Sequence, residues 1–139
     1  MDQKASDSGL VVLLDSSALV SVMLGEPGHE RIVERLAAAQ SAGISAPTLV
    51  EAAIVLSARL KRDARQQIRE FLREAEAEVL PFGPEHADAA VGAFLRYGKG
   101  RHPATLNFGD CLTYAASVTA GAPLLFAGSD FPKTDIEPA

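Results

Sequence analysis

The chain has 139 residues, of which 47% are hydrophobic and 22% are charged, values typical of one globular domain with its own core. A formal net charge of −5 excludes overall positive charge as a basis for nucleic-acid binding. No apolar run approaches the roughly 20 residues that a membrane span needs, and Cys111, the only cysteine, excludes an internal disulfide. The first nine residues are polar and lack a signal-peptide core, so we expect a loose tail over residues 1–9 and one domain over residues 10–139. These features predict a cytoplasmic protein without a membrane segment.

Short apolar strands alternate with amphipathic helices along the chain. The expected strands comprise residues 10–14, 43–47, 79–82 and 122–127, with 134–137 as a short final one. The expected helices comprise residues 17–24, 27–43, 47–60, 63–78, 84–95 and 108–119. This alternation predicts an α/β fold in which helices cover both faces of a parallel sheet.

Acidic residues recur where the predicted strands end or where helices begin. Asp15 and Asp130 each follow an apolar strand, and Glu51 lies in the first turns of the helix after residues 43–47. Asp110 opens the helix that precedes the last apolar strand. Because ligands of parallel α/β sheets bind outside the carboxyl ends of the strands, we expect these four carboxylates to share one crevice.

Each of these acids also has a purely structural interpretation. Asp15 is a good cap for the following helix, and Asp130 suits an Asx turn. The segments "TLVE" and "NFGD", which end on Glu51 and Asp110, match capping boxes, although Pro47 favours a cap one or two positions upstream of itself. Together, however, four carboxylates in one crevice repel one another unless a cation lies between them. A cluster of Asp and Glu without His or Cys favours Mg²⁺ or Mn²⁺ over zinc and indicates phosphate-ester chemistry.

The acidic residues lie within four longer segments: "VVLLDSSALVSVMLGEPG", "ISAPTLVEAAIVL", "RHPATLNFGDCLTYA" and "PLLFAGSDFPKTDI". In order and spacing, these segments resemble the motifs of PIN-domain ribonucleases, most closely the VapC toxins of bacterial toxin–antitoxin pairs. The resemblance spans nearly all of residues 10–137, and "LNFGDC" with the downstream "LLFAGSDFPKTDI" is its most specific part. It implies a three-layer α/β/α sandwich with a small central parallel sheet. It also implies a metal-dependent endoribonuclease that hydrolyses RNA as the toxin of a type II pair.

The resemblance implies a catalytic and metal-binding quartet, which maps onto Asp15, Glu51, Asp110 and Asp130. Mg²⁺ is the expected ion, with Mn²⁺ as a substitute, and Ser17 matches a hydroxyl position that supports the metal shell. The implied partners are an RNA substrate, a cognate VapB-like antitoxin and a second copy in a homodimer. The sequence departs from the family pattern in its polar N-terminus and in Ser129, which stands where an acid is common.

Basic residues form two further features. Lys99, Arg101 and His102 lie in the glycine-rich segment 98–107, for which RNA contact and a solvated loop both stay open. Arginines spaced three to four residues apart also predict one helix face, with glutamates close enough to pair with them. They are Arg62, Arg65, Arg69 and Arg73, with Glu70 and Glu74 as the expected partners. We interpret this face as a solvated, salt-bridged surface in preference to an RNA contact.

Other α/β proteins fit less well. A haloacid-dehalogenase-like phosphatase needs a second aspartate two residues after Asp15, where Ser17 stands. A receiver domain needs an acidic pair at the end of its first strand, and a dinucleotide-binding fold needs a glycine-rich turn there. The alternative that stays open is a catalytically silent PIN scaffold that acts only by binding other proteins.

Overall fold

A small parallel sheet organises the chain in the computed structural model, which describes residues 11–139. Its strands are β1 (Val11–Leu14), β2 (Ser41–Ser45), β3 (Ala77–Leu80) and β4 (Leu124–Leu125), in the order β3-β2-β1-β4. All pairings are parallel, with Leu13 of β1 opposite Gly43 of β2 and Leu124 of β4. The predicted N-terminal tail over residues 1–9 lies outside the described residues.

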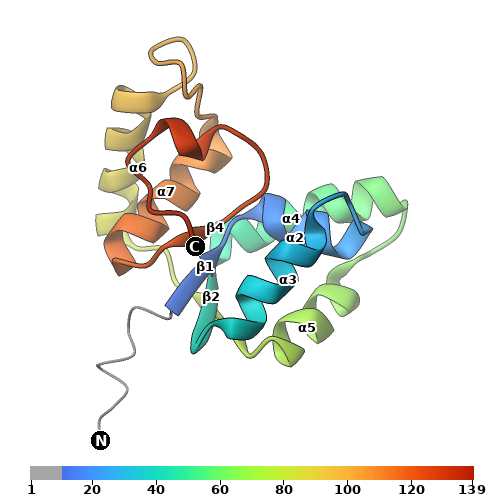
Figure 1. Ribbon diagram of the computed structural model, residues 1–139. Coiled ribbons are helices and arrows are strands. Elements are labelled where there is room, and N and C mark those ends of the chain that lie inside the picture. Colours follow the sequence, from blue (N-terminus) through green and yellow to red (C-terminus); the bar gives the residue numbers. More distant parts are fainter. Residues whose placement is uncertain (1–10) are drawn as a thin grey trace, which may run out of the picture.

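Within residues 11–139, six α-helices flank this sheet. They are α2 (Ser16–Leu24), α3 (His29–Ala38), α4 (Ala46–Leu60), α5 (Arg65–Glu74), α6 (Pro84–Tyr97) and α7 (Phe108–Ala120). Figure 1 shows α6 and α7 on one side of the sheet and the other four helices on the opposite side. The predicted three-layer α/β/α sandwich is therefore confirmed. Within residues 11–139, no helix combines the length and apolar character that crossing a bilayer requires.

The central strand β1 is buried on both faces, as its unbroken apolar run predicts. Successive strand residues point to opposite faces, so Leu13 joins the hydrophobic cluster of α6 and α7, while Leu14 joins that of α2 to α5. Both side chains are almost fully buried. Fixing β1 between two cores also fixes the position of the residue that follows it, Asp15.

Several predicted bounds are wrong. The strands expected over 43–47, 79–82 and 122–127 are β2, β3 and β4, which cover 41–45, 77–80 and 124–125. The helix expected over residues 63–78 ends at Glu74, because Glu76 adopts a left-handed backbone conformation (φ 54°) and the chain then enters β3. The helix expected over 27–43 gives way to β2 from Ser41. The strand expected over 134–137 is absent from the described part of the chain; a 3₁₀ helix, η2 (Phe131–Lys133), and a single bridge between Leu124 and Pro138 take its place.

Candidate active site

Asp15 directly follows β1 and is only 4% exposed. Its backbone N–H donates to the Leu125 carbonyl (3.0 Å), and its carboxylate accepts from the Ser17 N–H (3.0 Å) and hydroxyl. The Ser17 hydroxyl also accepts from the Ala127 N–H (2.9 Å). Asp15 is thus a helix cap, as one interpretation predicted. Ser17 joins it to the chain beyond β4.

Glu51 lies on α4 and points toward the start of α7. The Ser16 hydroxyl donates to its Oε1 (3.2 Å). A Cβ atom built on Gly109 would lie 2.6 Å from either carboxylate oxygen of Glu51, so any larger residue here would force this carboxylate to move. A buried hydrogen bond between Thr48 and Thr113 (2.9 Å) holds the two helices together at this level. Sequence reasoning did not single out Ser16 or Gly109.

Asp110 occupies the first turn of α7 in the predicted capping box. The Asn107 Oδ1 accepts from the Asp110 N–H (2.8 Å), and the Asp110 Oδ2 accepts from the Asn107 N–H (3.1 Å). The pKa of Asp110 is raised to about 6, mainly by burial and against the opposing effect of the Asn107 hydrogen bond. The charges of Asp15, Asp130 and Glu51 contribute to this rise. The structure therefore brings Asp110 within electrostatic reach of each of the other three acids.

Glu51 and Asp130 are the other two half-buried acids of this cluster. Burial raises the pKa of Glu51, and the charge of Asp15 adds to the effect, while the Ser16 hydrogen bond lowers it. Asp130 does not directly follow a strand as expected, because β4 ends at Leu125 and a turn precedes η2. The Asp130 side chain makes no capping hydrogen bond to η2. It is partly buried and contributes its charge to Asp110 from the end of this turn.

The fit of a metal ion to these acids rests on donor chemistry. Within residues 11–139, no three His, Cys, Asp or Glu side chains converge closely enough to form a ready metal site. Asp15 and Glu51 accept hydrogen bonds from serine hydroxyls, and Asp110 accepts one from a backbone N–H. The groups available to bind a metal ion are nevertheless all carboxylates, which hard divalent cations prefer. A bound cation would also relieve the repulsion among these carboxylates. The residues present fit Mg²⁺ or Mn²⁺ in donor type and charge, without forming a rigid cage.

The glycine-rich loop is held by its own basic residues. The Arg101 Nε donates to the Leu95 carbonyl (3.0 Å), and the His102 Nδ1 accepts from the Ala104 N–H (3.0 Å). The His102 ring also packs edge-on against Tyr97. Arg101 and His102 therefore stabilise the loop, and Lys99 is exposed on it.

The arginines of α5 do not pair as predicted. Arg65 forms its ion pair with Asp63 (2.8 Å), just before the helix, and Arg69 donates to Gln66 (3.2 Å). Among the described residues, no ion pair joins an arginine to Glu70 or Glu74. The expected salt-bridged face is wrong in its partners: the one pair that this face forms within residues 11–139 joins Arg65 to Asp63, two residues away.

Comparison with known proteins adds to this geometry. The family model described as PIN domain matches residues 12–137. The chain belongs to the PIN-domain family. This PIN domain is 48% identical over 127 residues to the ribonuclease VapC36 of Mycobacterium tuberculosis, and the match covers 91% of each chain.

Two solved structures share the fold of this PIN domain. One is Mycobacterium tuberculosis VapC20, described as a toxin that cleaves the Sarcin-Ricin loop (TM-score 0.74, 16% identity, 92% of this chain and 98% of that one). The other is VapBC2 from Rickettsia felis bound to a DNA fragment of its promoter (TM-score 0.70, 15% identity, 92% and 96%). At these identities the two structures support the fold alone.

The raised pKa of Asp110 predicts a pH-dependent stability in the absence of divalent ions. The folded state holds a proton on Asp110 up to about pH 6, whereas an unfolded aspartate releases it near pH 3.9, so stability falls as the pH rises through this window. Asp110→Asn should remove the part of this fall that Asp110 causes and stabilise the protein at pH 7 by about 1–2 kcal/mol after allowance for solvent screening. Urea unfolding in EDTA between pH 4 and pH 7 measures the effect. The exposed Asp88→Asn serves as a control, and identical pH profiles for wild type and Asp110→Asn would contradict the prediction.

Proposed function

We propose that this PIN domain is an endoribonuclease that hydrolyses RNA phosphodiester bonds as the toxin of a type II toxin–antitoxin pair. The observation that carries the proposal is the electrostatic coupling of Asp110 to three acids from distant parts of the chain. The family relation to VapC ribonucleases supports the same activity. A catalytically silent scaffold is not favoured, because such a protein has no need to keep four carboxylates in mutual repulsion.

We assign the catalytic centre to this acidic quartet and expect it to require Mg²⁺, with Mn²⁺ as a substitute. Bound among carboxylates, such an ion would lower the pKa of a water molecule and offset charge on the phosphate. Asp15 is the most rigid member, since β1 and Ser17 hold it from two sides. Asp110 is held by its capping box, and Glu51 by Ser16 and the space at Gly109. These contacts orient Asp15, Asp110 and Glu51, and Asp130 adds the fourth negative charge.

RNA contact is proposed for the glycine-rich loop through Lys99, Arg101 and His102. The loop lies directly before α7 in the sequence, and a backbone hydrogen bond from the Lys99 N–H to the Leu106 carbonyl (2.9 Å) holds it there while the Lys99 side chain stays exposed. Cellular RNA as the substrate also supports the cytoplasm as the place of action. In this interpretation the loop supplies the local positive charge that the chain as a whole lacks.

Two protein partners are proposed, a cognate VapB-like antitoxin and a second copy of this chain. VapBC2 of Rickettsia felis is a complex of this kind, which supports an antitoxin partner here. An exposed apolar face across α4, α6 and α7 supports the homodimer. It comprises Val50, Ile54, Val91, Phe94, Leu95 and Phe108. Phe108 is 80% exposed and borders two cavities of about 300 and 510 Å³, which suit apolar side chains of a partner.

Removing any carboxylate of the quartet should abolish RNA cleavage. Asp15→Asn, Glu51→Gln, Asp110→Asn and Asp130→Asn should each lower the cleavage rate about 100-fold or more, and EDTA should abolish it. The measurement is single-turnover cleavage of total cellular RNA with Mg²⁺ or Mn²⁺. Asp88→Asn, on the exposed face of α6, should cleave at the wild-type rate. Cleavage that is indifferent to EDTA or to Asp15→Asn would reject the metal-dependent mechanism.

Gly109→Ala tests the position of Glu51 without removing its charge. The new Cβ would displace the Glu51 carboxylate, so cleavage should fall at least about tenfold while the free energy of unfolding changes by no more than about 1 kcal/mol. Gly92→Ala is the matched control, because open space surrounds this position of α6. It should leave cleavage unchanged. Equal activity of the two variants would show that Glu51 needs no fixed position.

Phe108→Asp tests the homodimer. A charge in the centre of the apolar face should convert a dimer to a monomer in sedimentation experiments, because burying an unpaired carboxylate is costly. Val118→Asp, also exposed on α7 but outside both cavities, should keep the wild-type mass. A monomeric wild-type protein would reject the homodimer.

A further inference from the structure

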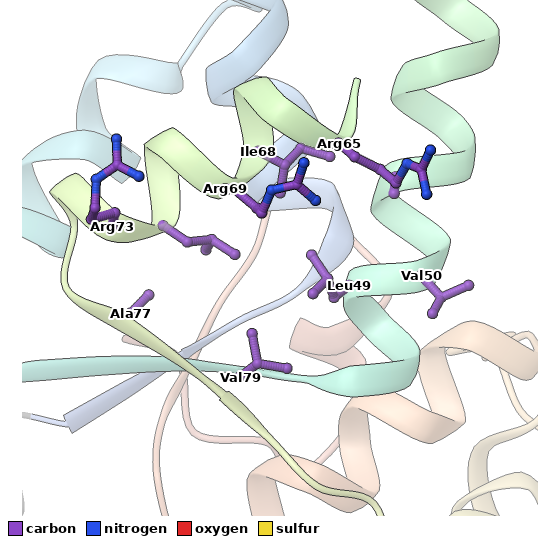
Figure 2. Close-up of a pocket in the computed structure, with 10 residues that line it drawn as sticks. Leu49, Val50, Arg65, Ile68, Arg69, Arg73, Ala77 and Val79 are labelled. Carbon is purple, nitrogen blue, oxygen red and sulfur yellow. The ribbon is translucent and has the colours of Figure 1, made fainter. Parts of the chain in front are cut away.

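Another pocket, of about 600 Å³, lies between α4, α5 and β3, and no carboxylate of the quartet lines it. Figure 2 shows Leu49 and Val50 on α4, Ala77 and Val79 on β3, and the residues of α5 around one hollow. Three of the residues that line it are arginines, and all the others are aliphatic. The arginines are Arg65, Arg69 and Arg73. The pocket therefore combines an apolar floor with a positive border.

The apolar part of this pocket extends beyond its floor. Ile68 and Leu72 are buried and form its base, whereas Val50 and Val79 are 57% and 44% exposed at its edges. Val79 belongs to β3, an edge strand of the sheet, so no further strand covers it among the described residues. Together with the apolar floor, these side chains extend the apolar surface that an occupant could cover.

The arginines follow one another at four-residue spacing along α5, so they share one face of the helix. Arg65 is paired with Asp63, whereas Arg69 and Arg73 have no ion-pair partner among the described residues. None of the ten residues that line the pocket is acidic, although the chain carries a net charge of −5. The positive border is therefore a local feature that selects a negatively charged occupant.

We propose that this pocket is the docking site for an amphipathic, acidic segment of a partner protein. Apolar side chains of the segment fill the floor between α4, α5 and β3, and its Asp or Glu side chains meet Arg69 and Arg73. The inference names a contact surface for the antitoxin partnership proposed above and rests on that proposal for the partner's identity.

Other occupants fit these observations less well. A small anionic ligand inside the pocket would leave Val79, at its outer edge, uncovered. RNA would engage the arginines, but the lining contains no aromatic side chain on which a base could stack. A second copy related by two-fold symmetry would bring the same patch against itself, so the two rows of arginines would repel. A peptide segment satisfies both the apolar and the charged parts.

A selection experiment with the full chain tests this proposal. The probe is a phage-displayed library of random 16-residue peptides, and the enriched peptides are measured by fluorescence anisotropy. We expect them to combine apolar residues at helical spacing with at least two acidic residues, and their binding to weaken with salt. Arg69→Glu/Arg73→Glu and, separately, Val79→Asp should each weaken binding about tenfold or more. Arg31→Glu/Arg35→Glu makes the same charge change at the same spacing on α3 and should bind like wild type.

Three results would overturn the proposal. The first is enrichment of peptides that are no more acidic than the library, or that bind Arg69→Glu/Arg73→Glu within about twofold of wild type. The second is a tenfold loss of RNA cleavage in this variant, which would assign the arginines to RNA. The third is loss of a dimer in this variant alone, which would assign the pocket to a second copy. Peptide binding is measured without RNA, so failure of the proposed nuclease activity is recognised separately.

Discussion

Repulsion among carboxylates is the constraint on which the functional interpretation of this fold depends. Asp15, Glu51 and Asp130 all act on Asp110, and together with burial they raise its pKa to about 6. Each negative charge disfavours the ionised form of its neighbours, so the cluster lowers the stability of the folded protein. A protein that made no use of the cluster would be expected to lose it. The rest of the molecule is built to keep these acids near one another in spite of that cost.

Helix starts supply much of that restraint. Asp15 is the cap of α2, and Asp110 closes a capping box at the start of α7, so both carboxylates lie where the helix dipole favours negative charge. The structural and the functional interpretations of these two residues are therefore compatible. The same hydrogen bonds that cap the N-termini of α2 and α7 also hold the acids in place. Ser17 extends the restraint to the chain after β4.

The sequence predicted the parts of this fold that have a strong local signal. The apolar run of β1 led to Asp15, and the helix starts led to Glu51 and Asp110. It failed where local signals are weak: β3 is half exposed and contains Glu78, and β4 is only two residues long, which misplaced the turn that carries Asp130. The contacts of Glu51 with Ser16 and Gly109 join residues 35 and more positions apart, so they emerge only in three dimensions.

Three consecutive residues in the first turn of α7 lie in three different environments. Phe108 faces outward into solvent, Gly109 lies against the carboxylate of Glu51, and Asp110 faces the other acids. Any rigid displacement of this turn therefore changes the outer apolar face and the acidic crevice at the same time. The outer apolar face and the acidic crevice are therefore mechanically coupled through this turn.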